Sequence, residues 1–188
     1  MRYLSVKEAQ RLINAADREF RPLVMAALAT GCRYSELTRL ECHDFNPDAG
    51  SIAIRKSKTG RARHVILTDE GVQFFRQHCA GRAGHELMFV HADGTGWRAS
   101  EQGRPMEAAC ARAKLKHVTL HTLRHSWASL AAMRGVPMTV IAANLGHIGT
   151  RTTEKHYAHL SDSHVRDAIR AGAPRFGFKP DEKIVPFN

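Results

Sequence analysis

The chain has 188 residues, 43% of them hydrophobic, and carries a formal net charge of +10 with an isoelectric point near 10.0. This length suits one domain, or one domain with a tail, and no stretch approaches the roughly 18 consecutive apolar residues that a membrane-spanning helix needs. The N-terminus lacks the apolar segment of a secretory signal, so we expect a cytoplasmic protein that does not enter a membrane. The excess of basic residues favours a polyanionic partner, above all nucleic acid.

The first forty residues predict three helices. Residues 5–16 open with the Ser-x-x-Glu pattern of a capping box, which starts a first helix. Pro22 suits the first turn of a second helix through the apolar residues 23–29, and Gly31 is placed to end it. A short third helix is expected over residues 35–40.

The hydrophobic period then changes to that of short strands. Residues 51–54 and 64–67 are strand candidates, and residues 43–45 add a third strand before a turn at 46–50. A strongly basic turn, residues 55–63, joins the first two candidates. Taken alone, such a run is the solvated tip of a hairpin.

Helices return in the rest of the chain, after a loop over residues 81–103. The predicted helices cover residues 69–80, 104–115, 121–134, 138–145, 150–157 and 162–171. The predicted fold class is therefore mainly α (α+β), a helical domain with a small three-stranded antiparallel sheet at one edge. We expect the domain to comprise residues 1–173 and a C-terminal tail to comprise residues 174–188.

Cysteine and histidine usage argues against a disulfide framework or a zinc site. The four cysteines are widely spaced without a C-x-x-C pair, which favours buried thiols; they are Cys32, Cys42, Cys79 and Cys110. A metalloprotease motif needs glutamate directly after its first histidine, and Thr122 stands in that position after His121. We therefore expect no bound metal.

The predicted helix 121–134 carries the chemistry that suits a phosphate. His121, Arg124 and His125 share one stripe of this helix with position 128, because residues three and four apart lie on one face. The opposite, apolar stripe consists of Leu123, Trp127 and Leu130. We expect the apolar stripe to pack inward and the arginine to be held outward, where its planar fork of donors fits two phosphate oxygens.

Further boxes along the chain complete a pattern that resembles the catalytic domain of the tyrosine recombinase (phage integrase) family, over residues 3–172. Its T-G-x-R-x-x-E-L box matches Thr30 to Leu37, with Arg33 and Glu36, and its hairpin lysine matches Lys58. Its H-x-x-R box matches His121 to Arg124, its L-G-H box matches Leu145 to His147, and its nucleophile matches Tyr157. His147 and Tyr157 are ten residues apart, whereas many members have nine, so we expect an extra residue in the connection at 149–151.

This resemblance implies a site-specific DNA recombinase. Tyr157 would attack a DNA phosphodiester, giving a 3′-phosphotyrosyl link and a free 5′-hydroxyl, and the 5′-hydroxyl of a second strand would reverse the step. Arg33 and Arg124 would clamp the transition-state charge. The remaining roles implied are general base for His121, general acid for Lys58, a hydrogen bond to the phosphate for His147, and support for Glu36, which would orient the arginines, and for His125.

The resemblance also implies the partners. These are double-stranded DNA and three further copies of the protein on synapsed DNA, with a monomer in isolation; accessory DNA-bending proteins are a further partner of such enzymes. Residues 174–188 would be exchanged between protomers. Members usually carry a separate N-terminal helical domain that has no counterpart in this sequence, so we expect the chain to be part of a longer integrase.

Two alternatives remain at this stage. A type IB topoisomerase shares the chemistry but relaxes DNA as a monomer, and the short spacing from the L-G-H box to the tyrosine favours the recombinase. A DNA-binding prophage remnant without catalysis is the second alternative. Candidates at all six catalytic positions argue against such decay.

Overall fold

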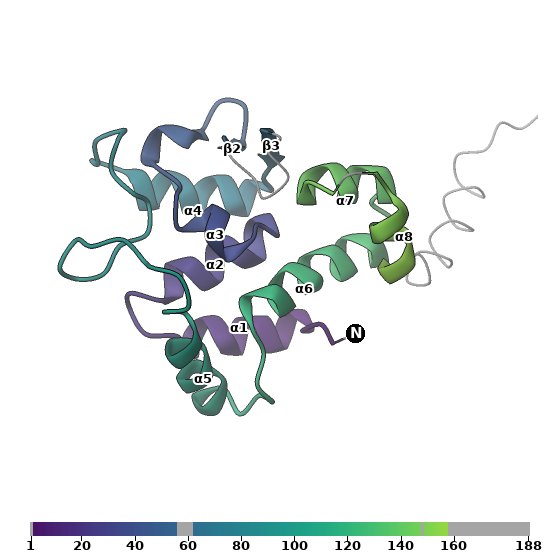
Figure 1. Cartoon of the computed structure of the whole chain (residues 1–188), viewed down its shortest axis with the longest axis horizontal. Helices are drawn as coiled ribbons and strands as arrows, with labels where there is room; N and C mark the ends of the chain where they lie inside the picture. Colours follow the sequence, from purple (N-terminus) through teal and green to yellow (C-terminus); the bar gives the residue numbers. More distant parts are fainter. Residues whose placement is uncertain (1, 56–61, 148, 158–188) are drawn as a thin grey trace, which may run out of the picture.

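A computed structural model describes residues 2–55, 62–147 and 149–157 (Figure 1). The described part is mainly helical, with one small antiparallel sheet, and this confirms the predicted fold class. Its elements in chain order are α1 (Val6–Ala15), α2 (Arg21–Thr30), α3 (Tyr34–Leu37), the 3-10 helix η1 (Cys42–Asp44), β1 (Phe45–Asn46), β2 (Ser51–Ile54), β3 (Arg63–Ile66), α4 (Asp69–Cys79), α5 (Gly103–Arg112), α6 (Leu120–Met133), α7 (Met138–Leu145) and α8 (Arg151–Tyr157).

The first two helices begin and end where the sequence predicts. The Ser5 hydroxyl accepts a hydrogen bond from the backbone N–H of Glu8, and the Glu8 carboxylate accepts one from the backbone N–H of Ser5, so a capping box opens α1. Gly31 ends α2 with φ +65°, a left-handed conformation that a side chain disfavours. This turn redirects the chain toward α3 and points the Gly31 carbonyl at α6.

The sheet has the order β1-β2-β3, and both pairs are antiparallel. The predicted strand at 43–45 is wrong in its first part, because His43 belongs to η1 and the strand begins at Phe45. The Asp44 carboxylate accepts a hydrogen bond from the backbone N–H of Glu41 at 2.9 Å, and this local bond favours the 3-10 turn. The strands at 51–54 and 63–66 are confirmed to within one residue.

Helix α6 runs through the middle of the molecule, where it packs mainly on α2 and also contacts α7 and α8 (Figure 1). Leu123 is fully buried in the main core, as predicted. The opposite stripe is buried in part: Ala128 packs with Ile141 and Leu145 of α7 in a second small core, whereas His121 stays exposed. The expectation that α6 holds its arginine outward is therefore wrong: Arg124 is only 3% exposed.

Several further predictions can be compared with the described residues. Residues 81–102 form no helix or strand apart from two isolated bridges, so the predicted loop ends one residue early, where α5 begins at Gly103; the four cysteines are free thiols, three of them buried. No helix in the described part is both long and apolar enough to span a membrane. The predicted helix at 162–171 and the tail at 174–188 lie outside the described residues.

Candidate active site

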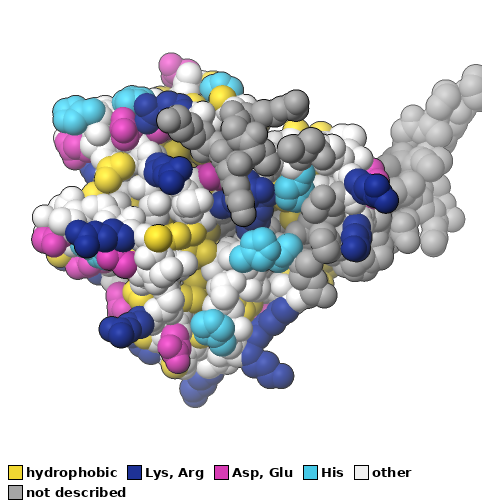
Figure 2. Space-filling model, viewed as in Figure 1, with side chains coloured by type: hydrophobic (Ala, Val, Ile, Leu, Met, Phe, Trp, Pro, Cys, Tyr) yellow, Lys and Arg dark blue, Asp and Glu magenta, His cyan; other side chains and the backbone are white. Residues whose placement is uncertain are grey.

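A cleft of about 390 Å³ opens between α3, the start of α5 and the start of α6. Its lining includes Arg33, His121 and Arg124, three of the predicted site residues, together with Tyr34 and Gln102. Figure 2 shows basic side chains (dark blue, Lys or Arg) and His side chains (cyan) near the middle of the face in view. The fold thus brings Arg33 into one hollow in the surface with His121 and Arg124, which lie far from it in the sequence.

Arg124 is held by backbone carbonyls at the inner wall of this cleft. Its Nη1 donates to the Gly31 carbonyl at 2.7 Å and its Nη2 to the Leu145 carbonyl at 2.8 Å. Both carbonyls come from the C-terminal ends of helices, α2 and α7, where such groups lack helical partners. The side chain of Arg124 therefore has one fixed position, set by the ends of two other helices.

Arg33 lies at the start of α3, where Glu36 closes the first turn. The Glu36 carboxylate accepts a hydrogen bond from the backbone N–H of Arg33 at 2.9 Å and one from Arg33 Nη1 at 3.0 Å. The side chain of Arg33 stays 27% exposed, whereas that of Glu36 is 2% exposed. Glu36 is therefore bonded to Arg33 directly, whereas no hydrogen bond or ion pair joins it to Arg124 among the described residues; its role in orienting the arginines stays a prediction.

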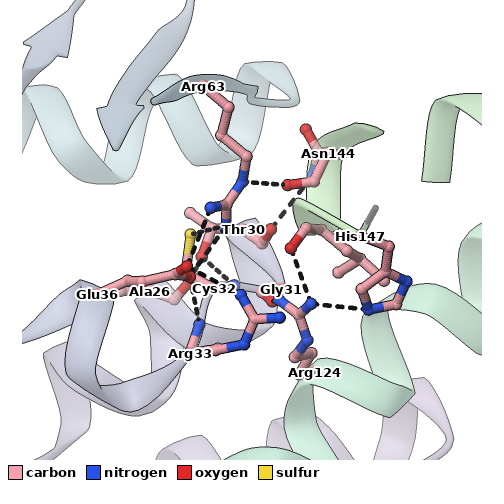
Figure 3. A network of polar contacts seen from close by, with 11 residues as sticks. Ala26, Thr30, Gly31, Cys32, Arg33, Glu36, Arg63, Arg124, Asn144 and His147 are labelled. Carbon is pink, nitrogen blue, oxygen red and sulfur yellow. Dashed lines mark hydrogen bonds and ion pairs between the residues drawn. The ribbon is translucent and has the colours of Figure 1, made fainter. Parts of the chain in front are cut away.

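The second partner of Glu36 is Arg63, which the sequence reasoning missed (Figure 3). Arg63 Nη1 and Nη2 donate to the two carboxylate oxygens at 2.9 Å each, and Nε donates to the carbonyl of Asn144 at 2.9 Å. Asn144 was also missed. Its side chain accepts from the backbone N–H of Ile66 at 3.0 Å and donates to the Thr30 carbonyl at 3.2 Å, so it joins α7 to β3 and α2.

His147 follows α7 and lies against Arg124. Its Nε2 is 3.0 Å from Arg124 Nη2, and its Nδ1 is 2.8 Å from the Thr153 hydroxyl of α8. A guanidinium has only donors, so Nε2 accepts and the ring proton is on Nδ1, which donates to Thr153. The donation of a hydrogen bond from His147 to a phosphate stays a prediction.

The other predicted residues divide into two groups. His121 and His125 lie one turn apart on α6 with their rings edge to face, 4.3 Å between centroids, and His121 is exposed at the cleft. Tyr157 is the last residue of α8, and nothing further is described of its side chain. Lys58 lies outside the described residues.

The charges of the side chains around Arg124 and Glu36 suit a bound anion. Burial and the charge of Arg33 lower the pKa of Arg124 to about 10. Arg124 is therefore still a cation at neutral pH, and its charge and that of Arg33 repel each other. Burial would raise the pKa of Glu36, yet the bonds from Arg63 and Arg33 hold it below its usual value. Three guanidinium groups and one carboxylate thus meet here, and a bound phosphate would relieve the excess positive charge.

Two further observations concern metal ligands and the second tyrosine near the cleft. Within the described residues, no three His, Cys, Asp or Glu side chains are grouped as metal ligands. The hydroxyl of Tyr34 donates to the Arg98 carbonyl at 2.7 Å, and burial raises its pKa to about 12. Tyr34 is therefore a poor nucleophile despite its place beside Arg33.

Residues 2–164 match the family model described as the phage integrase family. The integrase of Salmonella phage P22 is 29% identical over 190 residues, covering 94% of this chain and 48% of that protein. The crystal structure of XerA recombinase is 30% identical with a TM-score of 0.73, covering 94% of this chain and 66% of that one. The catalytic domain of bacteriophage HP1 integrase is 26% identical with a TM-score of 0.69, covering 92% and 95%.

A likeness in fold alone extends to XerH recombinase in a post-cleavage complex with its palindromic difH substrate. That chain is 21% identical with a TM-score of 0.65, and the match covers 88% of this chain and 52% of that one. The present chain spans about half to three fifths of the length of the curated relatives it matches first.

Proposed function

This chain belongs to the phage integrase family, as a catalytic domain of the tyrosine recombinase type, and we propose that it breaks and rejoins DNA at specific sites. The observation that carries the proposal is the pair of guanidinium groups at one cleft, Arg33 at its rim and Arg124 fixed by two helix ends. Two such cations suit the two non-bridging oxygens of a phosphodiester.

In the proposed reaction, the phenolic oxygen of Tyr157 attacks the phosphorus of a DNA phosphodiester. A bond forms between tyrosine and the 3′ phosphate, and the bond from phosphorus to the 5′ oxygen breaks. His121 takes the phenolic proton, and Lys58 gives a proton to the departing 5′ oxygen. Attack by the 5′-hydroxyl of a second strand reverses these steps, so the energy of the ester bond is kept and no cofactor is needed.

Arg33 and Arg124 stabilise the charge that builds up on the phosphate in the transition state. Preorganised donors of this kind are worth roughly 3–4 kcal/mol each when one is removed. The contacts of Arg124 with Gly31 and Leu145 support this role, because they hold the guanidinium in place before DNA arrives. Because His147 accepts from Arg124, we assign it first to orienting that arginine.

The substrate proposed is double-stranded DNA, which agrees with the net charge of +10 and with the DNA complex recorded for XerH. We further propose that four copies assemble on synapsed DNA, helped by accessory DNA-bending proteins, and that a single copy is monomeric. The catalytic domain would comprise residues 1–173, with residues 174–188 exchanged between protomers. The cytoplasmic location stays a prediction.

A covalent capture experiment tests this function and finds the target site in the same step. The protein is incubated, in chelator, with duplexes of randomised sequence nicked in one strand, so that a short cleaved fragment diffuses away and religation cannot erase the product. DNA that stays attached to protein through denaturation is recovered and sequenced. We expect a shared sequence motif joined to the protein through its 3′ phosphate.

Two tyrosine variants make the result specific. Tyr157→Phe should bind DNA and give no adduct, whereas Tyr34→Phe should still give one, because the Tyr34 hydroxyl is engaged with the Arg98 carbonyl. Adducts of wild type without a shared motif, together with relaxation of supercoils by monomers, would favour a topoisomerase. DNA binding with no adduct from wild type would favour the non-catalytic alternative.

A further inference from the structure

Arg63 belongs to the same group of charged side chains as Arg33, Glu36 and Arg124, but it does not line the cleft. It is the first residue of β3, and its side chain is 10% exposed. Of its five N–H donors, one goes to the Asn144 carbonyl, two to the oxygens of Glu36, and one toward the sulfur of Cys32 at 3.8 Å. With its donors committed to protein acceptors, Arg63 is unsuited to bind a phosphate itself.

The carboxylate of Glu36 is shared unequally between its two arginine neighbours. Arg63 makes a two-point contact with both oxygens, the strongest geometry available to this pair. Among the described residues, Arg33 gives only one side-chain donor to a protein acceptor, Glu36 Oε1. The charge of Glu36 is thus balanced mainly by Arg63, so Glu36 engages only one of the side-chain N–H donors of Arg33.

Arg63 also packs against the L-G-H box. A Cβ atom built on Gly146 would lie 2.8 Å from Arg63 Nη1 and 2.9 Å from its Cζ, closer than real Cβ contacts, so this glycine makes room for the guanidinium. The residue before it, Leu145, supplies the carbonyl that holds Arg124, and the residue after it is His147. Figure 3 shows Arg63 reaching down from β3 between Glu36 and Asn144.

We propose that Arg63 is a positioning residue of the cleavage reaction: by engaging both oxygens of Glu36, it keeps Arg33 available for the scissile phosphate. Its bond to the Asn144 carbonyl holds β3 against the segment that fixes Arg124 and His147. This inference rests on the proposed function. Without Arg63, the buried Glu36 carboxylate would take a second bond from Arg33 and draw that guanidinium away from the cleft.

The test measures single-turnover adduct formation on the nicked site recovered by covalent capture. The variants are Arg63→Met, Glu36→Gln and the double variant, with Arg55→Met as the matched control at the other end of the same hairpin, where the side chain is 52% exposed. Each is measured on the normal phosphodiester and on a methylphosphonate, in which a methyl group replaces one non-bridging oxygen. Thermal unfolding and DNA affinity are measured in parallel.

We expect Arg63→Met to slow adduct formation by about 100-fold on the phosphodiester, because one clamp on the transition-state charge is lost. On the uncharged methylphosphonate, the same change should cost less than about threefold, since little charge is left to clamp. Adding Glu36→Gln to Arg63→Met should recover about tenfold, because an amide no longer holds Arg33. The DNA affinity of each variant should stay close to that of wild type. The rate of adduct formation by the control Arg55→Met should also stay close to the wild-type rate.

Equal losses on the two substrates, or no recovery in the double variant, would overturn the proposal and leave Arg63 a residue of stability only. If Arg63→Met does not fold, Arg63→Lys replaces it, since one ammonium cannot engage both oxygens of Glu36 in the same way, and the expectations are unchanged in direction. Absence of any adduct from wild type refutes the proposed function instead, and the two failures are therefore distinct.

Discussion

Replacing Gly146 by alanine should destabilise the protein more than the same change at Gly149. Both glycines have positive φ, +68° and +81°, so alanine pays a similar backbone cost of about 1–2 kcal/mol at each. A Cβ on Gly146 would overlap Arg63, whereas a Cβ on Gly149 meets nothing within 4 Å. Gly149→Ala is therefore a control for the backbone cost alone.

The additional cost at Gly146 follows from how firmly Arg63 is held. The guanidinium is bonded to Glu36 and to the Asn144 carbonyl, so it moves aside only by losing hydrogen bonds. Overpacking of this kind costs about 1–3 kcal/mol. We expect Gly146→Ala to lose about 2–5 kcal/mol in total, against about 1–2 kcal/mol for Gly149→Ala.

Urea denaturation gives the two free energies of unfolding directly, and thermal unfolding provides a second measure. For a chain of this size, each kcal/mol lowers the melting temperature by about 2–4 °C, so the two variants should differ by roughly 2–12 °C. Equal losses in the two variants would refute the reasoning. It would mean that the close approach of Arg63 to the L-G-H box contributes nothing to stability.

Three further predictions concern stability and binding. Asn144→Ala should lower the free energy of unfolding by about 2–4 kcal/mol, because it leaves the N–H of Ile66 and the buried Thr30 carbonyl without their Asn144 partner. Val140→Ala, at an exposed position of the same helix, should lower it by less than about 0.5 kcal/mol in the same urea titration. The pKa of Glu36 is depressed in the folded state, so the stabilisation by its carboxylate is present above the ordinary carboxyl pKa and is lost as the pH falls through the folded-state pKa. The difference in stability between wild type and Glu36→Gln should therefore shrink on acidification. A difference that widens would contradict this. DNA affinity should fall with salt at a log–log slope of roughly −5 if about six phosphates are neutralised, and a salt-independent affinity would exclude DNA as the principal partner.

The helices were predictable because their signals are local. The capping box at Ser5 and the αL glycine at Gly31 act over three or four residues, and both stand where the sequence places them. The misplaced start of β1 has the same origin, since a hydrogen bond between Asp44 and Glu41 competes locally with the strand. The sequence contains no comparably strong signal for that 3-10 turn.

The side-chain contacts around Arg124 and Glu36 were only partly predictable, because they join residues that lie far apart in the sequence. Arg63 and Asn144 are 81 residues apart, and neither belongs to a box of the family pattern. One signal for Arg63 was present: it alternates with the buried Val65 on β3 and therefore shares its inward face. The burial of Arg124 was missed because the C-terminal ends of α2 and α7 meet its guanidinium, on a stripe of α6 that was expected to face solvent.

The most direct test of the account is to identify the residue that carries the DNA. The adduct recovered from nicked duplexes is digested with protease and nuclease, and tandem mass spectrometry locates the remaining nucleotide. The account predicts a single modified peptide, with the nucleotide joined through its 3′ phosphate to the phenolic oxygen of Tyr157. A nucleotide on Tyr34, on another side chain, or joined through a 5′ phosphate would contradict it.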